Sequence, residues 1–284
     1  PTRRTAGFQP AWWFVRKNPS VLRRMPAGSR RSAAVGALHF KPLLWLEWAM
    51  FEAFTRASVK AAQDAGGSLW DALTALVLPA LVFMALAFAV RGTASINTAR
   101  AAAGEMRINF MLYGIDILLV SPLLALLLGY TGAALQHANL VFLHPSNWQH
   151  LPQWLVAIIA VFAGDFIGFW RHRLEHTAPL WPAHAIHHSD THMTWTTGLR
   201  FHPLNRLTTA LVDTTFLALL GLPLWALMIN NLVRHYYGLF IHMDLPWTYG
   251  RLGRVFVSPA MHRWHHIRDA EGAGANFATV FSLF

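Results

Sequence analysis

Four long apolar runs constrain this chain more than any other feature of its sequence. They cover residues 69–90, 108–130, 152–170 and 207–230, and each is close to the ~20 residues that a helix needs to cross a bilayer. Lipid cannot satisfy backbone polar groups, so such segments fold as helices. The runs predict an all-α integral membrane protein with about four transmembrane helices. The fourth run contains Pro223, which is compatible with one kinked span or with a two-piece re-entrant hairpin.

The composition supports a membrane protein and excludes several other classes. Charged residues make up 13% of the chain, against about 25% in soluble domains. The 13 Trp and 19 Phe residues include the aromatics that gather at membrane interfaces. The sequence has no cysteine, which excludes disulfides, thiolate metal sites and cysteine-bound iron–sulfur clusters. Any metal must therefore be bound by histidine, carboxylate or water.

The net charge of +10 is concentrated near the N-terminus. Residues 1–60 contain eleven Lys or Arg and two acids. We predict irregular structure over 1–36 and an amphipathic helix lying in the membrane interface over 37–60. This gives a basic N-terminal extension over 1–67 and a membrane domain over 68–284. The basic block adjoins the spans and carries no nucleic-acid-binding motif, so we expect it to contact anionic lipid and not nucleic acid.

The loops between the apolar runs predict the orientation. Segment 91–107 contains three arginines, whereas segment 131–151 contains no Lys or Arg. The positive-inside rule places the first segment in the cytoplasm and the second outside. The third run then returns to the cytoplasm, where we expect a helical cap built from the residues that follow it.

Eight of the sixteen histidines lie in three short clusters. Residues three and four apart share one face of a helix, so each cluster projects imidazoles in one direction. Neutral imidazole is the commonest side-chain metal ligand. Proline at the start of the second cluster and Ser-Pro at the start of the third predict that both lie on short, newly started helices. The clusters are His172 and His176; His184, His187 and His188; and His262, His265 and His266.

Two further residues belong with these clusters. His242 shares a helical face with His235 and lies near the end of the fourth run, so we expect it to be a ninth ligand. Asp165 precedes His172 and His176 by seven and eleven residues, which places all three on one face. We expect Asp165 to be a catalytic-site residue that orients a ligand imidazole through its other ring nitrogen. A carboxylate that only packs helices together is the alternative.

Nine imidazoles exceed what one structural metal ion requires, because structural zinc takes four ligands. The number suits two ions with open positions, and iron matches both imidazole ligation and the open positions that O₂ chemistry needs. Two other classes remain open at this point. A histidine-rich metal transporter would hold its ligands near the bilayer midplane, and a membrane cytochrome b would hold haem between histidines inside facing spans.

The motifs HRLEH, WPAHAIHHS, RFHP and SPAMHRWHH, with Asp165 seven residues before the first, resemble those of the fatty acid hydroxylase/sterol desaturase superfamily. The resemblance covers roughly residues 70–284. It implies a membrane-embedded, non-haem di-iron oxidoreductase that uses O₂ and two external electrons to hydroxylate or desaturate a lipid C–H bond. It also implies that the eight clustered histidines bind two iron ions.

A reaction of this kind needs an electron donor. The chain has no GxGxxG motif, no P-loop and no cysteine for an iron–sulfur centre. We therefore expect a separate donor, such as a ferredoxin or a cytochrome b5-like protein with its reductase. The chain begins at Pro1 and stops at Phe284, where members of the family usually continue, so we expect it to be a fragment.

Overall fold

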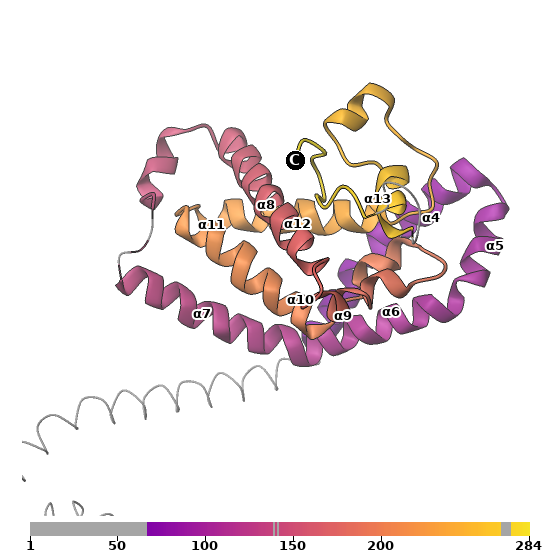
Figure 1. Cartoon of the computed structure of the whole chain (residues 1–284), viewed down its shortest axis with the longest axis horizontal. Helices are drawn as coiled ribbons and strands as arrows, with labels where there is room; N and C mark the ends of the chain where they lie inside the picture. The colour runs from indigo at the N-terminus through magenta and orange to yellow at the C-terminus, as the bar shows by residue number, and fades with distance from the viewer. Residues whose placement is uncertain (1–66, 139, 141, 268–273) are drawn as a thin grey trace, which may run out of the picture. The chain divides into compact units, whose positions relative to one another are not determined.

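The computed structural model describes residues 67–138, 140, 142–267 and 274–284, in which helices are the regular structure and no β-strand forms (Figure 1). An isolated antiparallel bridge joins Phe256 to Phe281 within these residues. The predicted all-α class is thus confirmed, while the predicted interfacial helix over 37–60 lies outside the described residues. The α-helices are α4 Val77–Arg91, α5 Ala94–Ala101, α6 Ala103–Ile115, α7 Ser121–His137, α8 Gln153–Glu175, α9 Trp181–His184, α10 Pro203–Thr208, α11 Thr215–Leu219, α12 Leu224–Ile241 and α13 Pro259–His266. The shorter helical segments are the π-helices η1 Asp116–Val120 and η5 Thr209–Thr214, and the 3₁₀ helices η2 Pro145–His150, η3 His187–Ser189, η4 Trp195–Leu199 and η6 Gly250–Arg254.

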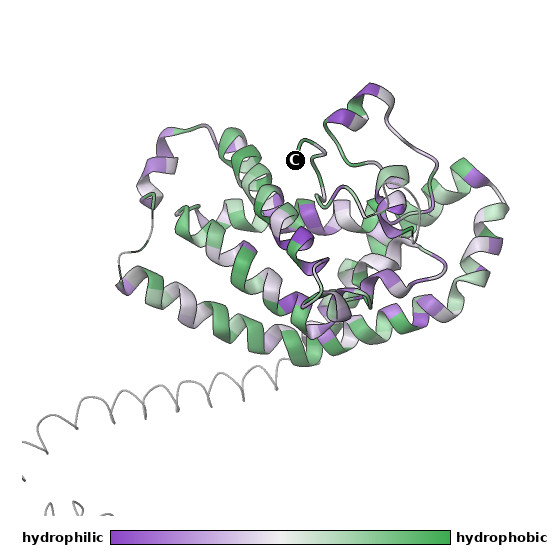
Figure 2. Ribbon diagram, in the orientation of Figure 1, coloured by the Kyte–Doolittle hydropathy of each residue, from purple (hydrophilic) through white to green (hydrophobic). Residues whose placement is uncertain are grey.

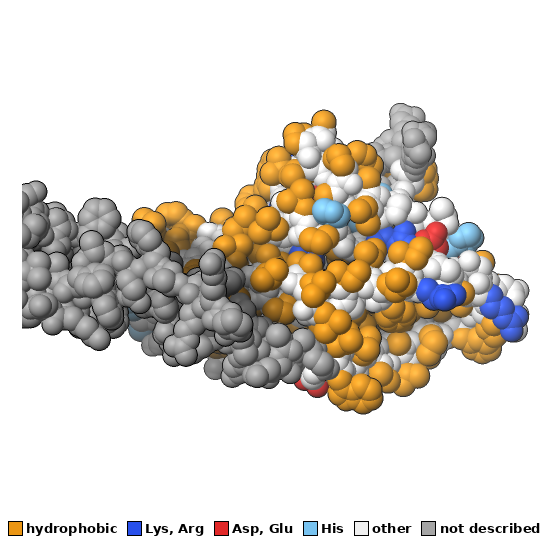
Figure 3. All heavy atoms as spheres, turned by 90° about the horizontal axis from the view of Figure 1, so that it is seen from below, with side chains coloured by type: hydrophobic (Ala, Val, Ile, Leu, Met, Phe, Trp, Pro, Cys, Tyr) orange, Lys and Arg blue, Asp and Glu red, His pale blue; other side chains and the backbone are white. Residues whose placement is uncertain are grey.

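Three helices of the described chain are long and apolar enough to cross a membrane. They are Gly67–Arg91, Ala103–Leu135 and Gln153–Glu175, and they contain most of the first three predicted runs. The second is a continuous helical segment made of α6, η1 and α7, which lies below the other helices in the view of Figure 1. Seen from below, hydrophobic side chains cover much of the surface that is not grey (Figure 3). Such a surface is suited to contact with lipid tails.

The fourth apolar run is not one helix. It is divided between η5 with α11, which end at Leu219, and α12, which begins at Leu224. Gly221 lies in the turn with φ 61°, a conformation that glycine adopts without a Cβ penalty. Pro223 then starts α12 as its N-cap, with an extended ψ of 148°. Of the two possibilities that Pro223 left open, the structure has two helices joined by a turn.

Helix α12 lies at the centre of the packing. It contributes Leu239, Ala226 and Ile241, one to each of the three buried apolar clusters. Its contact with α8 depends on two small residues one turn apart, since a Cβ at Gly164 would lie 2.1 Å from Asn230 Oδ1 and a Cβ at Gly168 would lie 2.0 Å from Arg234 Nη2. Small residues spaced by four allow such close approach of membrane helices.

The site lies where this helical frame becomes polar. Helix α8 is apolar through most of its length and hydrophilic at the end that carries His172 (Figure 2). The short helices α9, α10 and α13 gather near that end and near the end of α12 (Figure 1). The C-terminal ends of α8 and α12, which carry histidines, therefore lie beside the short helices α9 and α13, which also carry histidines.

Candidate metal centre

Each histidine cluster is positioned by a helix terminus. His172 lies on the last turn of α8 and His176, four residues later, is its C-cap. His242 is the C-cap of α12. Helix α13 starts as predicted: Ser258 is its N-cap, with Oγ accepting from the backbone N–H of Met261 at 3.2 Å, and a proline follows. Its eight residues carry the whole third cluster.

The second cluster is divided between two short helices. Trp181 and Pro182 start α9 as the sequence predicted, but this helix ends after one turn at His184. His187 and His188 then lie in the 3₁₀ helix η3. The change of backbone geometry between the two helices directs His187 away from its neighbours in the cluster.

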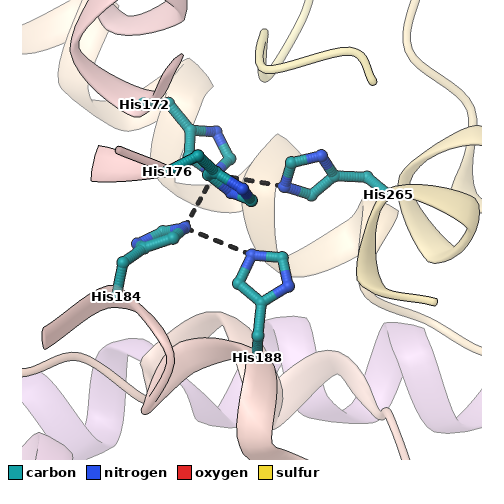
Figure 4. A group of neighbouring side chains, drawn as sticks. All are labelled: His172, His176, His184, His188 and His265. Atoms are coloured by element: carbon teal, nitrogen blue, oxygen red, sulfur yellow. Dashed lines mark hydrogen bonds between the residues drawn. The ribbon is translucent and has the colours of Figure 1, made fainter. Parts of the chain in front are cut away.

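The structure brings all nine predicted ligands together, in two groups. Each residue offers one nitrogen, and within each group these atoms lie within 4.8 Å of one another. Figure 4 shows the five-imidazole group, whose rings come from α8, α9, η3 and α13 and point toward one another. The five-imidazole group is His172, His176, His184, His188 and His265, and the four-imidazole group is His187, His242, His262 and His266.

Hydrogen bonds to carbonyl groups fix the tautomers in the five-imidazole group. His172 Nδ1 donates to the carbonyl of Phe277 at 2.8 Å, and His265 Nδ1 donates to the carbonyl of Ala275 at 3.0 Å. A carbonyl only accepts, so the hydrogen of each neutral ring is on Nδ1 and the Nε2 atom carries a lone pair. These two Nε2 atoms lie 3.2 Å apart. Two facing lone pairs repel unless a cation lies between or beside them.

The four-imidazole group repeats this arrangement. His187 Nδ1 donates to the carbonyl of Arg200 at 3.1 Å, and His242 Nδ1 donates to the carbonyl of Gly238 at 2.6 Å. Their Nε2 atoms face each other at 3.2 Å. His262 Nε2 lies 3.0 Å from that of His242, and its buried Nδ1 has no hydrogen-bond partner. The donor set of both groups thus fits a bound cation.

Burial keeps these imidazoles in the neutral form that binds metal. Removal from water lowers the pKa of His176 and His242 to about 4 and that of His265 to about 3. Burial, together with the neighbouring rings, lowers the pKa of His187 and His262 well below the ordinary 6.5. All of these rings are therefore free to donate a lone pair near neutral pH.

Asp165 does not contact an imidazole, so the direct orienting contact expected from the sequence is wrong. Its buried carboxylate accepts three backbone N–H groups, from Thr279 at 2.9 Å, Val280 at 2.9 Å and Phe281 at 2.7 Å. The C-terminal segment lies against the face of α8 that carries Asp165, and its backbone N–H groups donate to both carboxylate oxygens. Asp165 therefore holds the segment whose carbonyls, at Ala275 and Phe277, orient His265 and His172.

The carboxylate that approaches a ligand is Glu175. Its Oε2 lies 3.4 Å from His184 Nδ1 and also accepts from Arg171 Nη1 at 2.8 Å. Asn205 Nδ2 lies 3.3 Å from the same nitrogen of His184. The signal for Glu175 was inside the first motif, one residue before His176. The orienting backbone carbonyls had no sequence signal at all.

The remaining described histidines lie outside both groups. His144 bonds with Ser146 at the start of η2, and His202 Nδ1 accepts from the backbone of Leu204 at the start of α10. His235 belongs to neither group but lines a cavity of about 540 Å³. This cavity also reaches imidazole rings of both groups. The ligand rings that line it are His172, His184, His187, His242 and His262.

Comparisons with known proteins agree with this site. A family model described as fatty acid hydroxylase matches residues 156–284, which include every predicted ligand. An ornithine lipid hydroxylase of Rhizobium tropici is 29% identical over 134 residues, covering 47% of this chain and 40% of that protein. No solved structure matches the chain.

Two alkylglycerol monooxygenases are similar over the same extent. That of Caenorhabditis elegans is 29% identical over 128 residues, covering 45% of this chain and 25% of that protein. That of Danio rerio is 27% identical over 139 residues, covering 48% of this chain and 30% of that protein. The match thus spans less than half the length of each of these relatives. Residues 156–284 thus match the fatty acid hydroxylase family, in agreement with the fatty acid hydroxylase/sterol desaturase superfamily that the motifs resemble.

Proposed function

We propose that this protein is an O₂-dependent di-iron oxidoreductase that hydroxylates or desaturates a C–H bond of a membrane lipid. The observation that carries the proposal is the pair of imidazole groups in which unprotonated Nε2 atoms face each other at 3.2 Å. The match to the fatty acid hydroxylase family and the three apolar helices support the same reading.

The ligand set favours two iron ions. The five-imidazole and four-imidazole groups would each hold one ion, and a group of four leaves room for a further ligand at an octahedral metal. When bound, a pair of iron ions supplies the O₂-activating chemistry that no side chain of the protein can supply. Hydroxylation then balances as R–H, O₂, two electrons and two protons giving R–OH and water.

The protein's own residues would position the ions and the lipid. Carbonyls of Ala275 and Phe277 orient two rings of the five-imidazole group, and Glu175 approaches a third through His184. Such outer contacts fix ring orientation and raise ligand basicity. Asp165 affects these two rings indirectly, because its carboxylate binds the C-terminal segment that contains both carbonyls. The cavity beside the rings would hold the lipid and exclude bulk water.

We further propose that the histidines face the cytoplasm and that the helices before and after Gly221 enter the membrane as a hairpin. The arginines of segment 91–107 and the absence of Lys and Arg from segment 131–151 support this orientation. Since the chain has no cysteine, a His144→Cys variant has one thiol to label. A membrane-impermeant label should reach it only from outside, and labelling only from the cytoplasm would reverse the proposed orientation.

The electrons would come from an external one-electron donor, a ferredoxin or a cytochrome b5-like protein with its reductase. The most direct test of the function expresses the chain in a lipid-producing host and measures metal content together with the lipid profile. Iron in the purified protein and a new hydroxylated or unsaturated lipid, lost in a His265→Ala variant, would support the proposal. A histidine-rich metal transporter, the alternative, would change cellular metal content and leave the lipids unaltered.

A further inference from the structure

The cavity beside the imidazoles has walls that are more polar than a hydrocarbon chain requires. Its lining outside the metal ligands includes three arginines and two acids as well as threonine, serine and asparagine side chains. Enclosing a plain methylene chain here would strip water from those donors of the lining that have no protein acceptor, which is costly. The lining therefore favours a substrate that brings hydrogen-bonding atoms close to the metal groups. The charged residues are Arg171, Arg206, Arg234, Glu175 and Asp213.

Arg206 differs from the other two cavity arginines in its terminal nitrogens. Its Nε donates to Asp116 Oδ1 at 2.9 Å, and within the described chain neither Nη atom donates to a protein acceptor. In contrast, Arg171 and Arg234 each use a terminal nitrogen on a carboxylate, Arg171 on Glu175 and Arg234 on Asp213. A guanidinium presents its donors in a planar fork that matches acceptor oxygens. Arg206 can therefore hold an oxygen of a bound molecule and keep its ion pair.

A single aromatic ring separates Arg206 from a metal ligand. The guanidinium carbon lies 6.0 Å from the centre of the Phe201 ring. That ring stacks on His187 at 5.0 Å between centres, with an angle of 6° between the planes. Arg206 and His187 thus adjoin the same aromatic ring, which places an oxygen bound by Arg206 on the side of the cavity that carries the four-imidazole group.

Helix α7 supplies the apolar part of the cavity. Leu124 and Leu128, one turn apart, line it, and their neighbour Leu123 is exposed on the outside of the same helix. A hydrocarbon chain leaving the cavity along α7 would continue into the lipid that covers the exposed face. The polar and apolar parts of the lining thus match the two ends of a lipid.

We propose that Arg206 binds an uncharged acceptor oxygen, such as an amide or ester carbonyl, of the lipid that is oxidised. This deepens the proposed function by naming its substrate class. An uncharged oxygen suits the site better than a phosphate because Asp116 already balances the charge of Arg206, and Glu175 and Asp213 balance those of the other two arginines.

The test measures binding to the full-length protein with its metal bound and no electron donor present, so no turnover occurs. The probes are a radiolabelled fatty amide, the n-alkane of equal length and the corresponding alkyl phosphate. The amide should bind about 10-fold or more tightly than the alkane, since a hydrogen bond to a charged group contributes about that much. Arg206→Gln should bring the amide-to-alkane ratio close to one. Arg173→Gln is the matched control, because Arg173 stacks on Trp170 and lies outside the cavity lining.

A second variant separates recognition from folding. Asp116→Asn removes the same ion pair but leaves both Nη atoms of Arg206 in place, so it should keep the preference for the amide. Equal binding of amide and alkane to the unsubstituted protein would overturn the proposal, as would an unchanged ratio in Arg206→Gln or tighter binding of the phosphate. Because no oxidation is measured, these outcomes are independent of whether the loaded enzyme forms a hydroxylated or unsaturated product, which tests the proposed function itself.

Discussion

Replacing Asp165 by asparagine should release one metal ion and retain the other. The two carboxylate oxygens accept the N–H groups of Thr279, Val280 and Phe281. An amide has only one accepting oxygen, so its NH₂ group must face at least one of these N–H donors. Each hydrogen bond to a charged group contributes about 1.5–3 kcal/mol, so the loss of one bond weakens the docking of the C-terminal segment by about 10- to 150-fold.

The loss should be confined to one imidazole group. The segment held by Asp165 orients His172 and His265, which both belong to the five-imidazole group. In the four-imidazole group, His187 and His242 are oriented instead by carbonyls outside that segment. We therefore expect the metal content of folded protein to fall from two ions toward one per chain. Turnover should fall by about 10- to 100-fold, the range for loss of an outer contact of a metal ligand.

The assay is metal analysis of protein that has passed size-exclusion chromatography, with yield and thermal midpoint measured on the same sample. Asp71→Asn is the control, because this acid is exposed on the first described helix and belongs to neither imidazole group. Two ions per chain and full turnover in Asp165→Asn would refute the orienting role. A lower thermal midpoint with two ions per folded chain would reduce Asp165 to a purely structural residue.

Three further predictions follow from the same contacts. His265→Ala and His187→Ala should each abolish turnover, but each should remove the ion of a different group, so the double variant should lose both ions. Loss of both ions in either single variant would show that the two groups do not bind metal independently. Gly164→Ala should lower stability by about 1–3 kcal/mol, the range for overpacking, because its Cβ would lie 2.1 Å from Oδ1 of the fully buried Asn230. A thermal midpoint equal to that of Gly114→Ala, whose Cβ meets nothing within 4 Å, would contradict the packing. Below pH 6.5 the unfolded chain binds more protons than the folded metal-free protein, because burial holds the pKa of His176 and His242 at about 4 and that of His265 at about 3. The thermal midpoint of metal-free protein should therefore fall as the pH is lowered from about 6.5 to 4. A midpoint that rises over that interval would show that the rings are charged in the fold.

Much of this site was predictable because its determinants are local. Apolar runs of spanning length predicted the three long helices, and Ser258 with Pro259 predicted the start of α13. The helical spacing of the histidines predicted that they would converge. The break near Gly221 was only one of two readings, because a proline can either kink a span or start a new helix.

The division of the histidines between two groups could not be predicted from spacing. His184 and His188, one turn apart, join the five-imidazole group, while His187 between them joins the four-imidazole group. The third cluster divides in the same way, with His265 separated from its neighbours on α13. Each of these two clusters therefore supplies residues to both groups. This division depends on how α8, α12 and α13 approach one another and not on any local sequence pattern.

The orientation of the rings was also hidden from the sequence. Backbone carbonyls, which carry no side-chain signature, accept from His172, His187, His242 and His265. The helical face shared by Asp165 and the first histidines was a correct geometric feature, but the C-terminal segment occupies that face. A contact made by residues more than a hundred positions away cannot be read from the local period of a helix.

The central claim is that two iron ions lie among facing imidazoles. The most direct measurement is iron content combined with X-ray absorption spectroscopy of the purified, full-length protein. We expect about two iron ions per chain, nitrogen and oxygen ligands without sulfur, and no haem absorbance. A single ion per chain, zinc in both groups of an active preparation, or a haem spectrum would contradict this claim.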